Sequence, residues 1–215
     1  MTCCGSGAPA ATAKQFDEKR AAADLEAYRE KGPGKTARML LDGLAKISIT
    51  EGSLIDVGSG VGILTFELLR RGVTKATCVD LSSAYIATAR AEAKRLPTST
   101  DLQFLVGDFV EIGPTLPSAD IVTLDRVVCC YPEFDQLLDQ STRHAERALA
   151  LAYPKDLLYV RLWTGIENLI RRVRGNPFRS FIHDTTAIAS QIEAAGFQRV
   201  SRSSTLVWCA DVYAR

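Results

Sequence analysis

Short apolar segments alternate with segments of helical spacing from about residue 48 to the end of the chain. Apolar runs bounded by turn residues are typical of buried strands, and apolar positions three and four residues apart are typical of amphipathic helices. The predicted strands cover residues 53–57, 76–79, 102–106, 121–124, 157–162, 197–201 and 206–213. The predicted helices cover residues 61–71, 82–95, 133–149, 166–173 and 185–195.

This alternation predicts an α/β fold in which helices cover both faces of the sheet. The last two strands have no helix between them, so we expect an antiparallel hairpin at the sheet edge. The predicted fold is therefore a Rossmann-like, doubly wound, mostly parallel seven-stranded sheet. It carries an antiparallel C-terminal hairpin and extra N-terminal helices.

The N-terminal part of the chain has a different pattern. Its first residues are mostly Gly, Ala, Ser, Thr and Pro without periodicity, which is typical of a flexible tail. Two segments of helical spacing follow, over residues 14–30 and 35–46, and the breakers Gly32-Pro33-Gly34 separate them. We expect three parts, namely a tail over 1–13, a helical lid over 14–47 and the main domain over 48–215.

Composition narrows the class of protein. The chain has 215 residues, 47% hydrophobic and 24% charged, which suits one globular domain. Twenty-six basic and 25 acidic residues give a net charge of +1, which argues against a nucleic-acid partner. No apolar run is long enough to span a membrane, and the first residues lack the pattern of a secretory signal. We expect a cytoplasmic protein with no membrane partner; the oligomeric state is not predicted.

The six cysteines include two adjacent pairs, Cys3-Cys4 and Cys129-Cys130. These spacings match neither a secreted disulfide framework nor the usual zinc-ligand patterns. We therefore expect free thiols in a reducing compartment and no metal site.

The near-neutral total conceals two regions of opposite charge. Residues 97–140 contain eight acids and one base, whereas residues 161–183 contain five arginines and one acid. Two interpretations stay open: both regions are solvated faces, or the arginines recognise an anionic substrate.

A glycine-rich turn follows the first predicted strand. The stretch from Leu54 to Gly62 reads LIDVGSGVG, and open α/β sheets bind ligands where such a turn follows a strand. A dinucleotide fingerprint would place its third glycine at Ile63, so a nicotinamide dehydrogenase is disfavoured. Asp56, two residues before Gly58, suits a ligand with an ammonium group better than a pyrophosphate.

Acids also follow the next two strands. The second strand ends at Asp80, where a carboxylate can accept both hydroxyls of a ribose. The third strand is followed by Asp108-Phe109, an acid and an aromatic that could bind and sandwich a purine ring.

This ordered set resembles the class I S-adenosylmethionine-dependent methyltransferases over about residues 35–215, and more loosely their magnesium-protoporphyrin O-methyltransferase subgroup. The resemblance implies S-adenosylmethionine as cofactor, with Asp80 on the ribose and Asp108 and Phe109 on the adenine. The cofactor-binding residues that it implies are Asp56, Gly58, Ser59, Gly60, Gly62, Asp80, Leu81, Asp108, Phe109 and Asp125.

The resemblance also bears on the methyl acceptor. Many small-molecule members have a histidine pair where this chain has Cys129-Cys130, so the most common candidate base is absent. The catalytic candidates are Tyr131, His183 and Asp125. The candidate acceptor-binding residues are Cys129, Cys130, Tyr131, Arg171 and Arg172. A carboxylate acceptor would need no base, whereas a hydroxyl or amine would.

The resulting hypothesis is methyl transfer, by in-line displacement, to a small anionic or aromatic acceptor. The alternative is a catalytically idle cofactor-binding or regulatory module of the same fold.

Overall fold

The computed structural model describes residues 11–12, 15–47, 51–95 and 101–215. The predicted tail therefore lies outside the described residues apart from Ala11 and Thr12, as does the Cys3-Cys4 pair. Ala11 is buried, and the carbonyl of Thr12 accepts a hydrogen bond from the amide of Phe16 at 2.8 Å.

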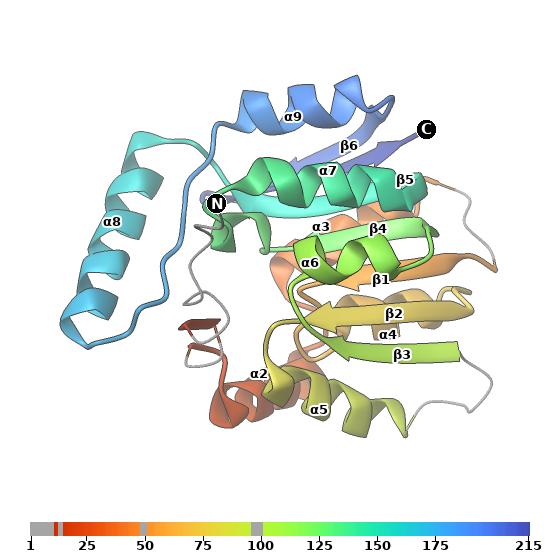
Figure 1. Ribbon diagram of the computed structural model, residues 1–215, viewed down its shortest axis with the longest axis horizontal. Helices are drawn as coiled ribbons and strands as arrows, with labels where there is room; N and C mark the ends of the chain where they lie inside the picture. Colours follow the sequence, from red (N-terminus) through yellow and green to blue (C-terminus); the bar gives the residue numbers. More distant parts are fainter. Residues whose placement is uncertain (1–10, 13–14, 48–50, 96–100) are drawn as a thin grey trace.

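Seven strands form one sheet in the order β3-β2-β1-β4-β5-β7-β6 (Figure 1). The strands are β1 Ser53–Val57, β2 Lys75–Asp80, β3 Asp101–Val106, β4 Ala119–Asp125, β5 Ala145–Pro154, β6 Gln198–Ser204 and β7 Trp208–Ala214. The first five pair in parallel, and β7 runs antiparallel to both β5 and β6. The predicted sheet and its C-terminal hairpin are confirmed.

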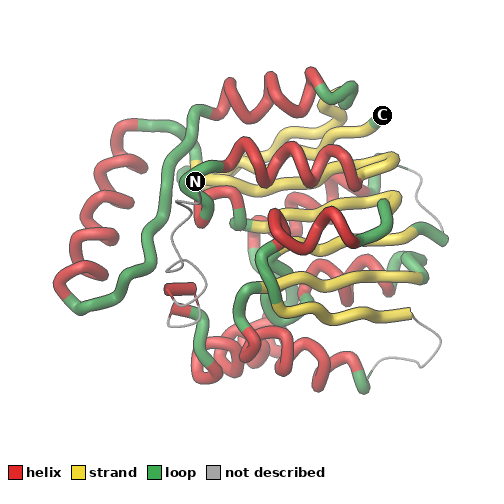
Figure 2. Tube along the Cα trace, in the orientation of Figure 1, coloured by secondary structure: helices red, strands yellow, loops and turns green. Residues whose placement is uncertain are grey.

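Helices cover both faces of this sheet (Figure 2). The α-helices are α2 Glu18–Lys31, α3 Lys35–Leu44, α4 Ile63–Leu69, α5 Ser83–Ala93, α6 Phe109–Ile112, α7 Phe134–His144, α8 Leu158–Val173 and α9 Thr185–Ala194. Short 3₁₀ turns, η1 Gly113–Thr115 and η2 Val128–Cys130, follow α6 and β4. Among the described residues, no helix is long and apolar enough to cross a membrane.

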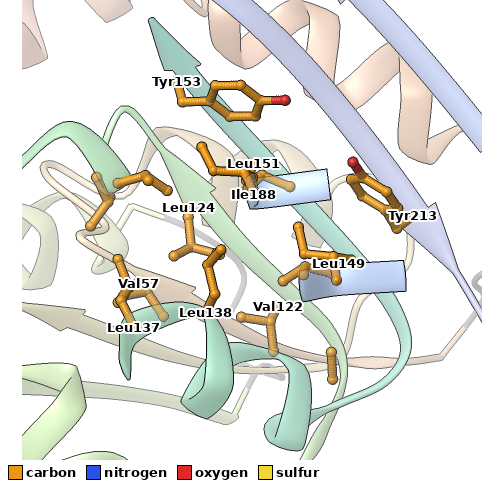
Figure 3. Close-up of a cluster of buried hydrophobic side chains, with 14 of the residues drawn as sticks. Val57, Val122, Leu124, Leu137, Leu138, Leu149, Leu151, Tyr153, Ile188 and Tyr213 are labelled. Atoms are coloured by element: carbon orange, nitrogen blue, oxygen red, sulfur yellow. The ribbon is translucent and has the colours of Figure 1, made fainter. Parts of the chain in front are cut away.

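The largest core cluster lies between the sheet and helices α7 and α9 (Figure 3). Side chains from β4 and β5, such as Leu124 and Leu151, pack there against Leu137, Leu138 and Ile188 of the helices. A second cluster lies on the opposite face, beneath α3 and α4. Burial of both faces explains why the central strands have nearly continuous apolar runs.

The prediction for residues 133–162 was wrong. The predicted helix over 133–149 ends at His144, and β5 begins at the next residue, where a helix had been expected to continue. Alanines at 145, 148, 150 and 152 favour helix locally, but these residues pair with β4 on one side and mostly with β7 on the other. Tertiary pairing therefore overrides helix propensity. The predicted strand over 157–162 is instead the first part of α8.

Helix α3, which lies within the predicted lid over 14–47, packs against the sheet. Leu40, Leu41 and Leu44 of α3 are buried with residues of β5 and β7, so a boundary at residue 48 would divide one core. The segment up to α2 and the first turn of α3, which includes Thr36, both border cavities at the sheet edge. The Tyr28 hydroxyl of α2 donates to Glu67 of α4 at 2.7 Å.

Candidate functional site

The carboxyl ends of four adjacent parallel strands, β3, β2, β1 and β4, lie along one side of the sheet, and a cavity of about 680 Å³ lies there. Gly58, Asp80, Asp108 and Asp125 come from the ends of β1, β2, β3 and β4 and all line this cavity. A second cavity of about 700 Å³ adjoins it. The residues that line both include Gly58, Gly60, Asp125 and Arg126, so the glycine turn lies at their junction.

The glycine turn requires its glycines for conformation and for space. Gly58, Gly60 and Gly62 have φ values of 61°, 56° and 85°, in the region that other residues rarely adopt. A β-carbon on Gly58 would come within 3.0 Å of Cγ2 of Val127. Gly62 caps α4 and faces Phe66, and it lines neither cavity. Its role is therefore in the turn and its packing.

Asp80 joins the glycine turn to the end of β2. Its two carboxylate oxygens accept the amides of Gly60 at 2.9 Å and Ser82 at 2.7 Å. Burial raises the pKa of Asp80, and the two amides oppose that rise. The neighbouring Leu81 also lines the cavity. Asp80 thus presents a fixed carboxylate with lone pairs left for a ligand.

Asp56 lies deeper, at the end of β1, and lines only the second cavity. Its oxygens accept hydroxyl hydrogen bonds from Thr65 at 2.8 Å and Thr123 at 2.7 Å. Burial raises the pKa of Asp56 to about 6 in spite of these bonds. Its neighbour Ser59 has a buried hydroxyl without a hydrogen-bond partner among the described residues.

Asp125 and Arg126 form the wall between the two cavities. Oδ1 of Asp125 is buried, has no hydrogen-bond partner among the described residues, and lies 3.8 Å from Nε of Arg126. Burial raises the pKa of Asp125. Arg126 has φ 63°, an unusual conformation for a residue with a side chain. Sequence reasoning missed Arg126, because no residue pattern announces a left-handed arginine.

Asp108 and Tyr131 are bonded to each other on the cavity wall. The Tyr131 hydroxyl donates to Oδ1 of Asp108 at 2.7 Å, and the same oxygen accepts the Val110 amide at 2.9 Å and so caps α6. Burial and the Asp108 carboxylate raise the pKa of Tyr131, so Tyr131 is poorly suited to act as a base. The Phe109 ring is buried against His144, edge to face at 5.6 Å, and meets the cavity only as its wall.

Cys129 and Cys130 lie in η2 and both line the first cavity. Their sulfur atoms lie 3.4 Å and 3.6 Å from the carbonyl of Arg126. The described cysteines are free thiols, and the described residues contain no group of three or more His, Cys, Asp or Glu that could hold a metal ion. The pair is thus a small, weakly polar surface beside Asp125.

His183, a catalytic candidate from the sequence, lines neither cavity. Its Nε2 lies 2.9 Å from the carbonyl of Tyr131 and 3.2 Å from that of Val128. Two carbonyl partners assign the proton to Nε2 as donor. The ring packs on Phe134 with centroids 4.5 Å apart. His183 therefore ties the segment before α9 to the loop after β4.

The structure separates the two predicted arginines. Arg171 lines the first cavity, donates to Glu167 at 3.1 Å and to Ser180 at 3.2 Å, and lies over the Phe178 ring. Arg172, the next residue, is exposed and lines neither cavity. Of these two arginines, only Arg171 lines a cavity.

Sequence reasoning also missed Phe16, which closes one side of the cavity. Its ring meets Tyr85 and Phe178 edge to face, with centroids 5.6 Å and 5.4 Å apart, and its carbonyl accepts the Ser82 hydroxyl at 2.6 Å. Arg20 and the Phe16 side chain line the cavity from the N-terminal segment. The lid expectation was the only signal of these residues.

The structure has the class I methyltransferase fold. Its strand order, its glycine turn and the acids that follow successive strands together define that fold. A sequence model of the family described as "Methyltransferase domain" matches residues 54–149, which extend from β1 into β5. A search of curated proteins finds no match to this chain.

Solved structures agree with this fold. Magnesium protoporphyrin IX methyltransferase from Synechocystis PCC 6803, with bound SAH, is 18% identical with a TM-score of 0.71, covering 95% of each chain. The same enzyme with bound SAM is 16% identical with a TM-score of 0.69, over 100% of each chain. A chain of the Haloferax volcanii complex between the Trm112 methyltransferase activator and a methyltransferase is 16% identical. Its TM-score is 0.67, over 94% of this chain and 96% of that chain.

Proposed function

We propose that this protein is an S-adenosylmethionine-dependent methyltransferase acting on a small acceptor. One observation carries the proposal: the glycine turn, Asp80, Asp108 and Asp125 surround a single cavity at the carboxyl ends of four adjacent strands. The similar Synechocystis enzyme with bound SAM supports it, because the likeness extends over 100% of each chain.

The cavity residues suit the nucleoside part of this cofactor. Asp80 has lone pairs free for two ribose hydroxyls beyond the amides that it already accepts. Asp108 shares one oxygen between Tyr131 and Val110 and can accept an adenine amino group with the other. Gly58 and Gly60 expose main chain rather than side chains. Ser59, Leu81 and Phe109 complete the proposed contacts.

The junction of the cavities suits the amino-acid part. Asp125 offers a buried carboxylate oxygen without a hydrogen-bond partner among the described residues, and an ammonium group would satisfy it. Arg126, beside it, offers the opposite charge for a carboxylate. Asp56 beneath the turn adds negative potential, tempered by its raised pKa. We propose that Asp125 and Arg126 together bind a zwitterionic ligand end.

S-adenosylmethionine supplies an activated methyl group on a sulfonium when it is bound. The chain's own contribution is to align and enclose the acceptor, an effect worth roughly 7–11 kcal/mol for well-oriented reactants. Cys129 and Cys130 form the surface beside Asp125, and Arg171 can attract an anion from across the cavity. Because the hydroxyl of Tyr131 and Nε2 of His183 are engaged elsewhere, the site favours an acceptor that needs no base, such as a carboxylate.

The cofactor proposal can be tested by calorimetry with two ligands. S-adenosylhomocysteine has the amino-acid end, whereas 5′-methylthioadenosine lacks it. Asp125→Asn should weaken S-adenosylhomocysteine about tenfold or more, through loss of a charge-assisted contact, and leave methylthioadenosine unchanged. The exposed Asp42→Asn is the matched control and should change neither. Absence of S-adenosylhomocysteine binding to the wild type would refute the proposal.

The acceptor proposal needs a turnover assay. Transfer of a labelled methyl group should be measured with a panel of small carboxylates and phenols. Arg171→Gln should raise the acceptor KM and spare the cofactor affinity, whereas Arg172→Gln should change neither. Equal effects of the two variants would remove Arg171 from acceptor binding. Intact cofactor binding without turnover of any acceptor would favour the idle module.

A further inference from the structure

Helix α8 presents its polar side to the protein. The half-buried residues Thr164, Glu167, Asn168 and Arg171 face the body. The Asn168 side chain donates to the Ser180 carbonyl at 2.8 Å and accepts the Ser180 amide at 3.0 Å. Several polar contacts thus fix the orientation of the helix.

The other side of α8 is apolar and exposed. At about 100° per residue, eight apolar residues fall within an arc of about 140° and extend along the whole helix. They are 44% to 84% exposed. This apolar face of α8 comprises Leu158, Tyr159, Leu162, Trp163, Ile166, Leu169, Ile170 and Val173. The exposed Leu206 adjoins it, because its carbonyl accepts the Tyr159 hydroxyl.

This arrangement is the reverse of an ordinary surface helix, whose apolar side faces the core. Soluble monomers rarely leave an apolar stripe of this extent uncovered. In Figure 1, α8 stands at the margin of the molecule, apart from the other helices.

The surroundings of the apolar face indicate the charge of its partner. On the same helical projection, Arg161 and Arg172 border one edge of the face, and Arg174 follows its C-terminal end. Arg161 pairs with Asp156, whereas Arg172 and Arg174 form no ion pair within the described part of the chain. No acid lies within the arc. Free cations beside an apolar stripe favour an anionic partner with an apolar interior.

We propose that α8 lies on the surface of an anionic lipid bilayer, with its apolar face at the boundary between head groups and acyl chains. Trp163 and Tyr159 are aromatic types common at this depth, and Arg172 and Arg174 would meet the anionic head groups. A second copy of this chain fits less well, because it would bring the exposed arginines of both copies to one interface. Glu167, at the other edge of the face, is already bonded to Arg171 and Trp163. The proposal does not depend on methyl transfer.

Vesicle co-sedimentation tests this proposal. The full chain should bind vesicles containing phosphatidylglycerol at least tenfold more strongly than pure phosphatidylcholine vesicles. Leu162→Gln/Leu169→Gln should lower the partition coefficient about tenfold or more. Val106→Gln/Val200→Gln, which removes two exposed valines from the strand β3 and the strand β6, should leave it unchanged.

Charge and fluorescence provide independent readouts. Arg172→Gln/Arg174→Gln should reduce binding to anionic vesicles and remove its preference over neutral ones. Tryptophan emission should shift to shorter wavelength when vesicles are added, and Trp163→Phe should abolish the shift. Thermal unfolding midpoints within a few degrees of wild type would show that the variants fold.

Three outcomes would overturn the proposal. The first is absence of binding to every vesicle by folded wild-type protein. The second is vesicle binding that Leu162→Gln/Leu169→Gln does not weaken. The third is a concentration-dependent dimer that the same variant dissociates, without lipid binding, which would assign the apolar face to a second copy of the chain.

Discussion

Replacement of Gly58 by alanine is the sharpest perturbation of the glycine turn. Gly58 has φ 61°, and a β-carbon there would come within 3.0 Å of Cγ2 of Val127. Val127 is itself buried in the main core and also lines the first cavity, so relief of the clash requires its side chain to shift toward that cavity. The substitution therefore combines backbone strain with a steric clash.

The two effects can be estimated separately. A left-handed conformation costs an alanine about 1–2 kcal/mol, and overpacking of a buried site costs about 1–3 kcal/mol more. Gly58→Ala should thus lower the free energy of unfolding by about 2–5 kcal/mol. Gly60→Ala is the matched control, because Gly60 has φ 56° but its nearest neighbour, Cδ1 of Tyr85, would lie at 3.4 Å. Gly60→Ala should therefore cost only the backbone strain, about 1–2 kcal/mol.

Urea unfolding, monitored by circular dichroism, gives the free energies of unfolding of the Gly58→Ala and Gly60→Ala variants. In a double-mutant cycle, Val127→Ala removes the clashing methyl groups and should recover about 1 kcal/mol or more of the loss from Gly58→Ala. The reasoning is refuted if Gly58→Ala and Gly60→Ala destabilise equally. It is also refuted if Val127→Ala recovers nothing in the Gly58→Ala background.

Two further predictions concern buried acids. Folding raises the pKa of Asp56 from 3.8 to about 6, so the folded state binds this proton more tightly than the unfolded state does. The free energy of unfolding should therefore fall by about 3 kcal/mol as the pH rises from below 3.8 to above about 6. Asp56→Asn should flatten that dependence in urea titrations at pH 4 to 7; an unchanged slope would exclude Asp56 as its source. The second acid, Asp211, is fully buried. Its carboxylate accepts two hydrogen bonds from the Arg202 guanidinium, at 2.6 Å and 2.7 Å, and one from the Tyr153 hydroxyl at 2.6 Å. Asp211→Asn should therefore lower the free energy of unfolding by about 2–3 kcal/mol. Asp101 forms an exposed ion pair, so Asp101→Asn should lower the free energy of unfolding by less than about 1 kcal/mol. Equal losses for Asp211→Asn and Asp101→Asn in urea unfolding would contradict this difference between buried and exposed pairs.

The first half of the sheet could be predicted because its local and global preferences agree. Each strand from β1 to β4 is a short apolar run between turn residues, and Gly58 marks the end of the first. Agreement is lost at β5, where alanines with high helix propensity pair into the sheet. That conflict is visible only once β4 and β7 are in place on either side.

The placement of the acids that follow β2, β3 and β4 could be predicted, but their bonding could not. Strand ends place Asp80, Asp108 and Asp125 at one edge of the sheet, because the strands are parallel. Nothing in the sequence shows that Tyr131 bonds Asp108, or that His183 turns to main-chain carbonyls. Such choices depend on side-chain directions that only the folded chain fixes.

The error at residues 157–162 and the proposed role of α8 have one physical origin. Sequence reasoning assigns apolar residues to the core, so Leu158 and Leu162 were assigned to a strand. In the structure, the polar residues of α8 bind the body, and these leucines face outward. The same assumption underlies the expectation of no membrane partner, which considered only segments that span a bilayer. A helix that lies on a bilayer needs an apolar side and a cationic border instead, and α8 has both.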